Sequence, residues 1–254
     1  MPIIDFAQVS KYYGGQPVLD GISLSIAAGS FVALVGASGA GKTTLLKVVN
    51  RLVDIDSGTV AVNGQDVVSQ PAVTLRRTIG YVFQGIGLFP HMTVAENIWL
   101  VPRLAGLKIS GREARVAALL DMVSLPVELA DRYPGQLSGG QAQRVGFARA
   151  LAAGPAIMLM DEPFGALDPV TRGDIGPAYR SLHERMGLTS LLVTHDMAEA
   201  LILADRVIIL AEGRILADMT PHELVRARTN PAISAMVDAA RASAARLEAL
   251  ARET

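Results

Sequence analysis

A glycine-rich segment between residues 36 and 44 has the residue types and spacing of a phosphate-binding loop. Gly36, Gly41, Lys42 and Thr43 occupy the fixed positions of the pattern G-x-x-x-x-G-K-[ST]. Glycines let backbone N–H groups approach a phosphate chain, and a helix that begins at the loop directs its positive end toward the anion. Lys42 would supply a mobile positive charge, and the hydroxyl of Thr43 suits Mg²⁺, which prefers oxygen ligands. The segment therefore predicts a site for nucleotide phosphates.

A turn of Gly, Ala and Ser that only joins a strand to a helix is the structural alternative for this loop. The Lys-Thr pair and the flanking patterns, an apolar strand before and a helical spacing after, favour phosphate binding. The residues predicted to contact the nucleotide here are Gly36, Ala37, Ser38, Gly39, Ala40, Gly41, Lys42, Thr43 and Thr44.

Two carboxylates, Asp161 and Glu162, follow four apolar residues, IMLM, that are typical of a buried strand. Ligands of α/β proteins bind at the carboxyl ends of such strands. Asp161 is suited to hold Mg²⁺ through water, and Glu162 to polarise a water that attacks the terminal phosphate. An acidic pair on a surface turn is the alternative, but the phosphate-binding loop in the same chain favours the metal site.

Strands and helices that position these groups can be predicted from the hydrophobic pattern. Apolar strands are expected at Phe31–Val35, just before the loop, and at Ile157–Met160. SLLVTHD and RVIILAEGRILA indicate further strands around a helix in MAEALILA. Strands alternating with helices predict an α/β fold.

The first sixty residues predict an antiparallel edge to this fold. Ile3–Val9 and Val18–Ile26 alternate apolar and polar residues and flank the connection KYYGGQP, which contains Tyr12 and Tyr13. An aromatic ring on this connection would either stack on a purine base or pack on the sheet, and the sequence does not separate these alternatives. SGTVAVNGQDV predicts a hairpin that turns at Asn63-Gly64. IGYVFQ, from Ile79 to Gln84, predicts a buried strand that ends in an amide.

Helical patterns without a strand extend from about residue 85 to 154 and predict a helical subdomain inserted into the core. Within it, Ser138 and Gln141 have the spacing of a helix capping box. Thr220 and Glu223 repeat that spacing later in the chain. From Pro231 an amphipathic helix is expected, with one apolar face formed by Ile233, Met236, Val237, Ala240, Ala244 and Leu247. The expected division is 1–230 for the main domain and 231–254 for this helix.

Composition narrows the class of protein. The chain of 254 residues has no cysteine, which excludes disulfides, cysteine-ligated zinc and thiol catalysis. A net charge of −1 with scattered basic residues gives no electrostatic basis for nucleic-acid binding. The start lacks the pattern of a signal peptide, and no apolar run reaches the ~18 residues of a membrane span, so a cytosolic location is expected.

The segment LSGGQAQRV, Leu137 to Val145, distinguishes this chain from other proteins with a phosphate-binding loop. With it, residues Ile3 to about Asn230 resemble the ATP-binding subunit of an ABC transporter, a P-loop NTPase with a RecA-like core. The resemblance implies ATP and Mg²⁺ as cofactors and a dimer that holds two ATP molecules between its subunits. The residues expected to face the γ-phosphate bound by the opposite subunit are Ser138, Gly139, Gly140 and Gln141.

The same resemblance implies roles for four more residues. Tyr13, followed by glycine, matches the aromatic that stacks on adenine. Gln84 matches the glutamine that touches Mg²⁺ and the attacking water, and Asp168 in GALDP matches the loop that links the two active sites. His195 in VTHD matches the switch histidine that contacts the γ-phosphate. The expected catalytic residues are Glu162, His195 and Gln84, and the expected metal-binding residues are Thr43, Gln84 and Asp161.

A closer resemblance concerns the transported substrate. RRTIGYVFQGIGLFPHMTVAENIWLVPRL, DRYPGQLSGG and LMDEPFGALDPVTR look most like importers of glycine betaine, choline and related quaternary-amine osmoprotectants. This implies a transmembrane permease, a solute-binding protein, and a place on the inner face of the cell membrane. Such ATPases often continue into paired CBS domains, so any osmotic sensing is expected outside this chain. An apolar set, Ile86, Leu88, Phe89 and Met92, is expected either to receive a permease helix or to pack internally.

Other functions share the phosphate chemistry. A polar amino acid importer or a lipid-trafficking ABC system would have the same motifs, and only its partners would differ. A non-transport ABC ATPase of DNA repair or translation fits less well, because no long coiled coil lies between the two motifs and only one cassette is present.

Overall fold

The computed structural model describes residues 2–85, 87–106, 111–227 and 230–252, with side chains described as far as residue 242. Ile86, one of the expected apolar set, lies outside the described residues. So do the side chains of Ala244 and Leu247, which were expected on the apolar face of the last helix. Among the described residues, no helix is both long and apolar enough to cross a membrane.

A six-stranded sheet forms the centre of the molecule, in the order β10-β9-β3-β8-β7-β6. All neighbours pair in parallel except β10, which runs antiparallel to β9. Every residue of β3, β7 and β8 is buried, as the continuous apolar runs predicted, since both faces of a parallel sheet are covered. The strands are β3 (Phe31–Val35), β6 (Ile79–Val82), β7 (Ile157–Asp161), β8 (Thr189–Val193), β9 (Arg206–Ala211) and β10 (Arg214–Met219).

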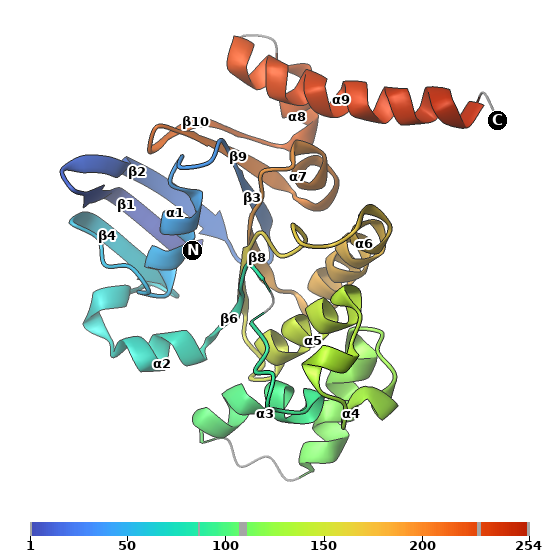
Figure 1. The fold of residues 1–254 in the computed structure, drawn as a ribbon. Helices are drawn as coiled ribbons and strands as arrows, with labels where there is room; N and C mark the ends of the chain where they lie inside the picture. Colours follow the sequence, from blue (N-terminus) through green and yellow to red (C-terminus); the bar gives the residue numbers. More distant parts are fainter. Residues whose placement is uncertain (1, 86, 107–110, 228–229, 253–254) are drawn as a thin grey trace.

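A second, antiparallel sheet lies beside the first, in the order β2-β1-β4-β5 (Figure 1). Its strands are β1 (Pro2–Tyr13), β2 (Gln16–Ala27), β4 (Ser57–Val62) and β5 (Gln65–Asp66). The predicted turn at Asn63-Gly64 is confirmed, with φ of +52° and +74°, as a two-residue hairpin with positive φ at both positions requires. The prediction that Tyr12 and Tyr13 lie in a loop is wrong, because β1 continues to Tyr13 and pairs there with Gln16.

Helices cover the parallel sheet and extend beyond its β6 edge. In Figure 1, α3, α4 and α5 lie at one end of the molecule, and α8 and α9 lie at the opposite end. Between β6 and β7 the described residues contain helices and no strand. The α-helices are α1 (Lys42–Val49), α2 (Ala72–Arg77), α3 (Val94–Leu104), α4 (Arg112–Met122), α5 (Gly139–Leu151), α6 (Pro169–Met186), α7 (Met197–Leu203), α8 (Pro221–Arg226) and α9 (Pro231–Arg252).

Side-chain caps begin several of these helices. Thr93, Ser138 and Thr220 each accept a hydrogen bond from the backbone N–H three residues on. Their own backbone N–H groups donate to the side-chain oxygens of Glu96, Gln141 and Glu223. The predicted capping boxes at Ser138 and Thr220 are therefore confirmed. Two predicted features differ: the strand from Ile79 ends at Val82 rather than Gln84, and α6 was not expected from the sequence.

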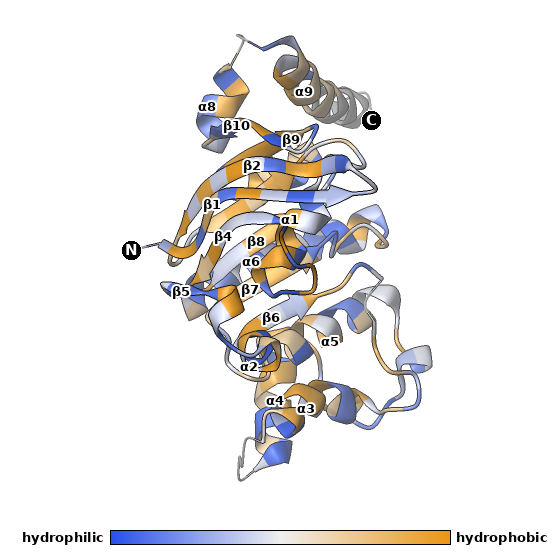
Figure 2. Ribbon diagram, turned by 90° about the vertical axis from the view of Figure 1, so that its left-hand side faces the viewer, coloured by the Kyte–Doolittle hydropathy of each residue, from blue (hydrophilic) through white to orange (hydrophobic). Residues whose placement is uncertain are grey.

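Two apolar cores lie on the two faces of the parallel sheet. One fills the space between this sheet, α1 and the antiparallel sheet, and the other lies under α3–α7 and includes Ile233 and Val237 of α9. Figure 2 shows the apolar residues concentrated along the strands of both sheets. The helix from Pro231 is thus anchored to the core by its first turns, where it packs on α7 and α8.

Candidate nucleotide-binding and catalytic site

The phosphate-binding loop joins β3 to α1 at the carboxyl edge of the parallel sheet. Gly41 precedes α1 with φ of +98°, and no described side chain caps this helix start. The first N–H groups of an α-helix lack partners within the helix, so they remain available to an anion. A Cβ at Gly36 would lie 2.3 Å from the carbonyl oxygen of Leu210, and one at Gly41 would lie 2.4 Å from that of Val18. Only glycine fits these two positions.

Lys42 lies beneath this loop and is 6% exposed. Its Nζ donates hydrogen bonds to the carbonyl oxygens of Gly36, at 2.7 Å, and Ala37, at 2.8 Å. Burial lowers the pKa of the Lys42 ammonium, while the charges of Glu162 and Asp161 act in the opposite direction. The loop therefore holds a partly desolvated positive charge, which a phosphate chain would compensate.

Thr43 and Asp161 are brought together as predicted for a metal site. The Thr43 hydroxyl donates to Oδ1 of Asp161 at 2.8 Å, and Asp161 is 5% exposed. Burial raises the pKa of Tyr81, and the charge of Asp161 adds to this rise. The described residues contain no group of three or more His, Cys, Asp or Glu side chains arranged for a metal. A hydroxyl and one carboxylate fit Mg²⁺, which keeps few protein ligands and shares its shell with phosphates and water.

Glu162 is in contact with the two other predicted catalytic residues. Its Oε2 accepts a hydrogen bond from Nε2 of Gln84 at 3.4 Å and lies 3.3 Å from Nδ1 of His195. The backbone of Glu162 has φ of +45°, a left-handed conformation that costs free energy for a residue with a side chain and often marks functional sites. The Glu162 N–H donates to the carbonyl oxygen of Val193 at 2.9 Å, which ties this turn to β8.

A cleft of about 630 Å³ joins these groups. Tyr13 lies on its wall, half exposed, with the Lys11 ammonium 5.4 Å from the ring centroid. Lys11 also forms an ion pair with Asp56 at 3.0 Å. This exposure disfavours the alternative in which the ring packs on the sheet and leaves Tyr13 available to a base. The cleft is lined by Tyr13, Val18, Ser38, Gly39, Gly41, Lys42, Thr43, Thr44, Gln84, Glu162 and His195.

The residues expected to contact a second nucleotide do not line this cleft. Ser138 and Gln141 form their capping box at the start of α5, with distances of 3.2 and 3.0 Å. Asp168 caps α6 by accepting from the Thr171 N–H at 2.9 Å, and hydrogen bonding to Thr171 lowers the pKa of its carboxyl. Within one chain, these two helix starts are therefore separate from the phosphate-binding loop.

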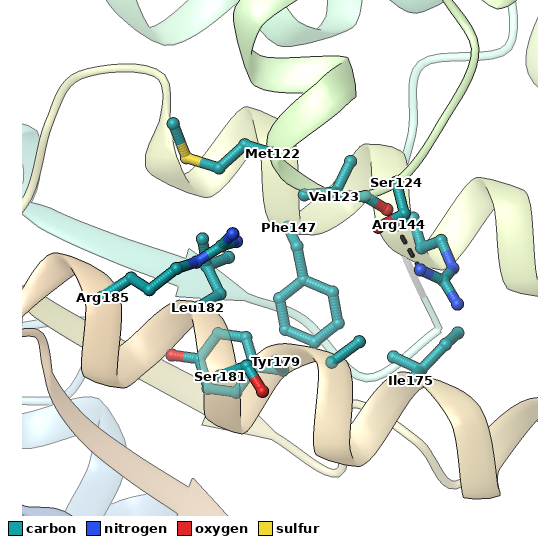
Figure 3. Close-up of a pocket in the computed structure, with 11 residues that line it drawn as sticks. Met122, Val123, Ser124, Arg144, Phe147, Ile175, Tyr179, Ser181, Leu182 and Arg185 are labelled. Atoms are coloured by element: carbon teal, nitrogen blue, oxygen red, sulfur yellow. Dashed lines mark hydrogen bonds between the residues drawn. The ribbon is translucent and has the colours of Figure 1, made fainter.

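Another pocket, of about 210 Å³, lies among α4, α5 and α6 (Figure 3). Phe147, Tyr179 and Leu182 form an apolar floor, with Arg144 and Arg185 at its sides. Arg144 donates to the carbonyl oxygen of Val123 at 3.1 Å. No residue of the phosphate-binding loop lines this pocket, so the nucleotide cleft is a different site.

Comparison with known proteins agrees with this geometry. A family model described as ABC transporter matches residues 19–165, which contain the phosphate-binding loop, LSGGQ and the Asp161-Glu162 pair. The chain belongs to the ABC transporter family. The sequence of this chain is 34% identical to that of the ATP-binding cassette MJ0796, whose dimeric structure in a post-hydrolysis state has ADP and Pi bound. The TM-score is 0.77, and the match covers 86% of this chain and 98% of the other.

Two curated relatives have different cargoes in their names. A glycine betaine/carnitine/choline transport ATP-binding protein, OpuCA of Bacillus subtilis, is 48% identical over 91% of this ABC chain and 60% of its own length. A sulfate/thiosulfate import ATP-binding protein, CysA of Bradyrhizobium diazoefficiens, is 46% identical over 87% of this chain and 64% of its own length. The chain thus spans less than two thirds of the length of either relative.

Sequence reasoning missed several residues around this ABC site. Tyr81 lies near Asp161, and Lys11 lies over the ring of Tyr13. Arg172 pairs with Asp196, the residue after His195. No local spacing marks such contacts. For Arg172, the only signal was its place in GALDPVTR, one helical turn after Asp168.

Proposed function

We propose that this chain is the ATP-hydrolysing subunit of an ABC importer. The observation that carries the proposal is the Glu162 carboxylate, which contacts Gln84 and His195 and lies in the same cleft as Lys42 and Thr43. In phosphoryl transfer, the protein positions the nucleophile and stabilises charge, and this cleft contains groups for both tasks.

Each side chain has a part in this proposal. Glu162 orients the attacking water and accepts its proton, while Gln84 and His195 hold the Glu162 carboxylate in place. Lys42 and the N–H groups at the start of α1 neutralise the phosphates. Thr43, Asp161 and Gln84 would hold Mg²⁺, which supplies charge neutralisation when it is bound.

A complete site would contain two copies of this chain. Ser138–Gln141 and Asp168 lie outside the cleft of their own chain, so they would act on nucleotide bound by the partner. The MJ0796 cassette, with which this chain shares its fold, is a dimer. A homodimer, or a pair with a related ATPase, closes both sites by symmetry.

A membrane permease would bind near the end of β6. A groove of about 200 Å³ lies there, lined in part by Leu52, Tyr81 and Phe83, and the Phe83 side chain is 46% exposed. Phe89, a few residues further on, is 41% exposed, whereas Leu88 is partly buried against the core. Phe89 is thus available to a partner, whereas Leu88 packs internally. Permease binding places the chain on the inner face of the cell membrane.

The cargo we propose is a quaternary-amine osmoprotectant such as glycine betaine or choline, delivered to the permease by a solute-binding protein. The support is the resemblance of the segment from Gln84 to Leu104 and the name of the OpuCA relative. The CysA relative makes an oxyanion importer the second candidate. In domain terms, we assign 1–230 to the ATPase domain, with a helical subdomain at about 85–154, and 231–254 to the C-terminal helix.

Uptake in the host organism tests the cargo. Cells that lack this chain should lose uptake of labelled glycine betaine at high osmolarity and keep uptake of labelled sulfate. Expression of the wild-type chain should restore betaine uptake. Expression of Glu162→Gln should not, because this variant keeps the fold but lacks the catalytic base. Loss of sulfate uptake with normal betaine uptake would replace the cargo assignment and leave the ATPase assignment intact.

A further inference from the structure

We propose that Arg172 is a positioning residue that joins the loop carrying Asp168 to the loop carrying His195, so that the two active-site loops move together. The inference rests on the proposed function, because it assigns a task to the predicted catalytic and nucleotide-contacting groups. The guanidinium donates from Nη2 to the carbonyl oxygen of Leu167 at 3.2 Å, and its Nη1 lies 3.5 Å from Oδ2 of Asp196.

The two loops leave neighbouring strands of the parallel sheet. β7 and β8 pair in register, with Asp161 opposite Val193, and each strand is followed by a loop and then a helix, α6 or α7. Leu167 immediately precedes Asp168, the cap of α6, and Asp196 immediately follows His195. Arg172, in the first turn of α6, therefore contacts Leu167, the residue before Asp168, and Asp196, the residue after His195. The helices α6 and α7 are labelled in Figure 1.

The His195 backbone is held from both sides. Before it, the Thr194 N–H donates to the carbonyl oxygen of Leu34 at 3.1 Å, and Thr194 is 3% exposed. After it, the Asp196 N–H donates to the Thr194 hydroxyl at 3.0 Å, and Oδ1 of Asp196 accepts from the Ala198 N–H at 2.9 Å. The second carboxylate oxygen of Asp196 is the one that faces Arg172. Moving α6 would thus move the backbone next to His195.

The charges around Arg172 suit a positioning role. Asp196 and Glu199 both lie near the guanidinium; burial raises the pKa of Glu199, and the charges of Arg172 and His195 oppose part of that rise. Arg172 Nε is buried and makes no hydrogen bond within the described residues, so the two Nη groups make its contacts. The Arg172 and Asp196 side chains are 34% and 36% exposed. An ion pair this exposed adds little to stability, so its loss should change the position of the loops more than the fold.

A matched control lies on the same helix. Arg180 also donates to a carbonyl oxygen, that of Leu203 at 3.1 Å, and to carboxylates, Asp205 and Glu184, both at 2.8 Å. It contacts neither active-site loop. Arg180 also lies 5.7 Å from the centroid of the Phe31 ring, so Arg180→Ala removes more guanidinium contacts than Arg172→Ala without touching the proposed connection.

Kinetics and hydrogen exchange of the full chain test the proposal. Arg172→Ala should lower kcat for ATP hydrolysis by about tenfold, because the loops that carry Asp168 and His195 lose their connection. KM should change by less than about twofold, because the phosphate-binding loop is unchanged. Arg172→Lys, which keeps the charge facing Asp196, should recover part of the rate. Asp196→Asn keeps the Oδ1 acceptor that caps α7 but loses the charge, and should match Arg172→Ala. The double variant should be no worse than either single variant.

Amide exchange provides a readout that does not depend on hydrolysis. Without nucleotide, Arg172→Ala should speed exchange in the peptide that covers residues 194–200, and Arg180→Ala should not. Unchanged exchange there, equal effects of both variants, or additive losses in the double variant would overturn the proposal. A wild-type chain that does not hydrolyse ATP would instead overturn the proposed function, and the exchange result would still decide whether the loops are connected.

Discussion

Glu162 combines a strained backbone with side-chain contacts to Gln84 and His195. Its φ of +45° places it at a turn that the apolar run before it could not reveal. The residue type and position could be predicted from IMLMDE, because the strand and the acidic pair are local. The contacts with Gln84 and His195 could be predicted only through the family resemblance, because these residues are far apart in the sequence.

Replacing Glu162 by Gln should stop hydrolysis and leave ATP binding intact. The amide keeps the shape and the contacts with Gln84 but cannot accept the proton of the attacking water, so a loss of about 10²- to 10⁴-fold in kcat is expected. Steady-state kinetics and equilibrium binding of ATP measure the two effects. Near-normal turnover in the variant would show that Glu162 is not the base that accepts the proton of the attacking water.

Replacing Lys42 by Ala should act at an earlier step. The change removes the positive charge held by the carbonyl oxygens of Gly36 and Ala37, and ATP affinity should fall by at least about tenfold because a charge-assisted contact with the phosphates is lost. Calorimetric titration with ATP measures this, with adenosine as a control ligand that lacks phosphates. Unchanged ATP affinity would contradict the assignment of the phosphate-binding loop.

The raised pKa of Glu199 predicts how the stability of the fold changes with pH. Burial raises the pKa of Glu199 to about 6 from an ordinary value of 4.5. Between these values the folded chain keeps a proton that the unfolded chain loses, so this residue's contribution to stability falls as pH rises through that window and is lowest above pH 6. Glu199→Gln removes the cost, which amounts to about 2 kcal/mol at most. Chemical unfolding should show the variant more stable at pH 7.5 and equal to wild type near pH 4; a gain of the same size at both pH values would contradict this origin.

Helix α6 could not be predicted from the local sequence pattern. Its 18 residues include Gly173, Gly176 and Pro177, which disfavour a helix by propensity, and its few buried apolar residues make only a short apolar face. Tertiary packing of Ile175, Tyr179 and Leu182 into the core stabilises it instead. By contrast, α5 and α8 begin at capping boxes, and the central strands are uninterrupted apolar runs, so both kinds of element could be predicted from local patterns.

The segment between β6 and α3 is where partner binding can be tested. Phe89→Gln should uncouple uptake from hydrolysis in cells while the isolated chain keeps its ATPase rate and its Tm. The reason is that an exposed aromatic contributes to a partner interface more than to its own fold. Val127, also half exposed but outside the segment between β6 and α3, is the control: Val127→Gln should change neither activity.

If Phe89→Gln lowers both the isolated ATPase rate and the Tm, the ring packs internally and the partner interpretation fails. The segment also contains Gln84, so it connects the active site with the proposed permease groove. ATP hydrolysis that is coupled to transport is therefore the activity that a change in this segment should affect most.

For the whole molecule, the main consequence of the structure is that one chain holds only half of each proposed site. The cleft contains the phosphate-binding loop and Glu162, while the starts of α5 and α6 lie outside it. The fold of the core could be predicted because its motifs are local. The separation of the two halves within one chain could be predicted only through the family resemblance, because no local pattern shows where elements far apart in the sequence are placed.

Mixing two inactive variants tests the shared site most directly. Lys42→Ala removes the phosphate-binding half. Gly139→Asp removes the α5 half by adding a negative charge, and it is preferred to a change at Gly140, because a Cβ at Gly140 would lie 2.5 Å from Thr171 whereas one at Gly139 has no contact closer than 3.9 Å. Each variant alone should be inactive, and an equal mixture should recover about one quarter of the wild-type rate, because half of the dimers then contain one intact site. No activity at any mixing ratio, or full activity of either variant alone, would contradict a site built from two chains.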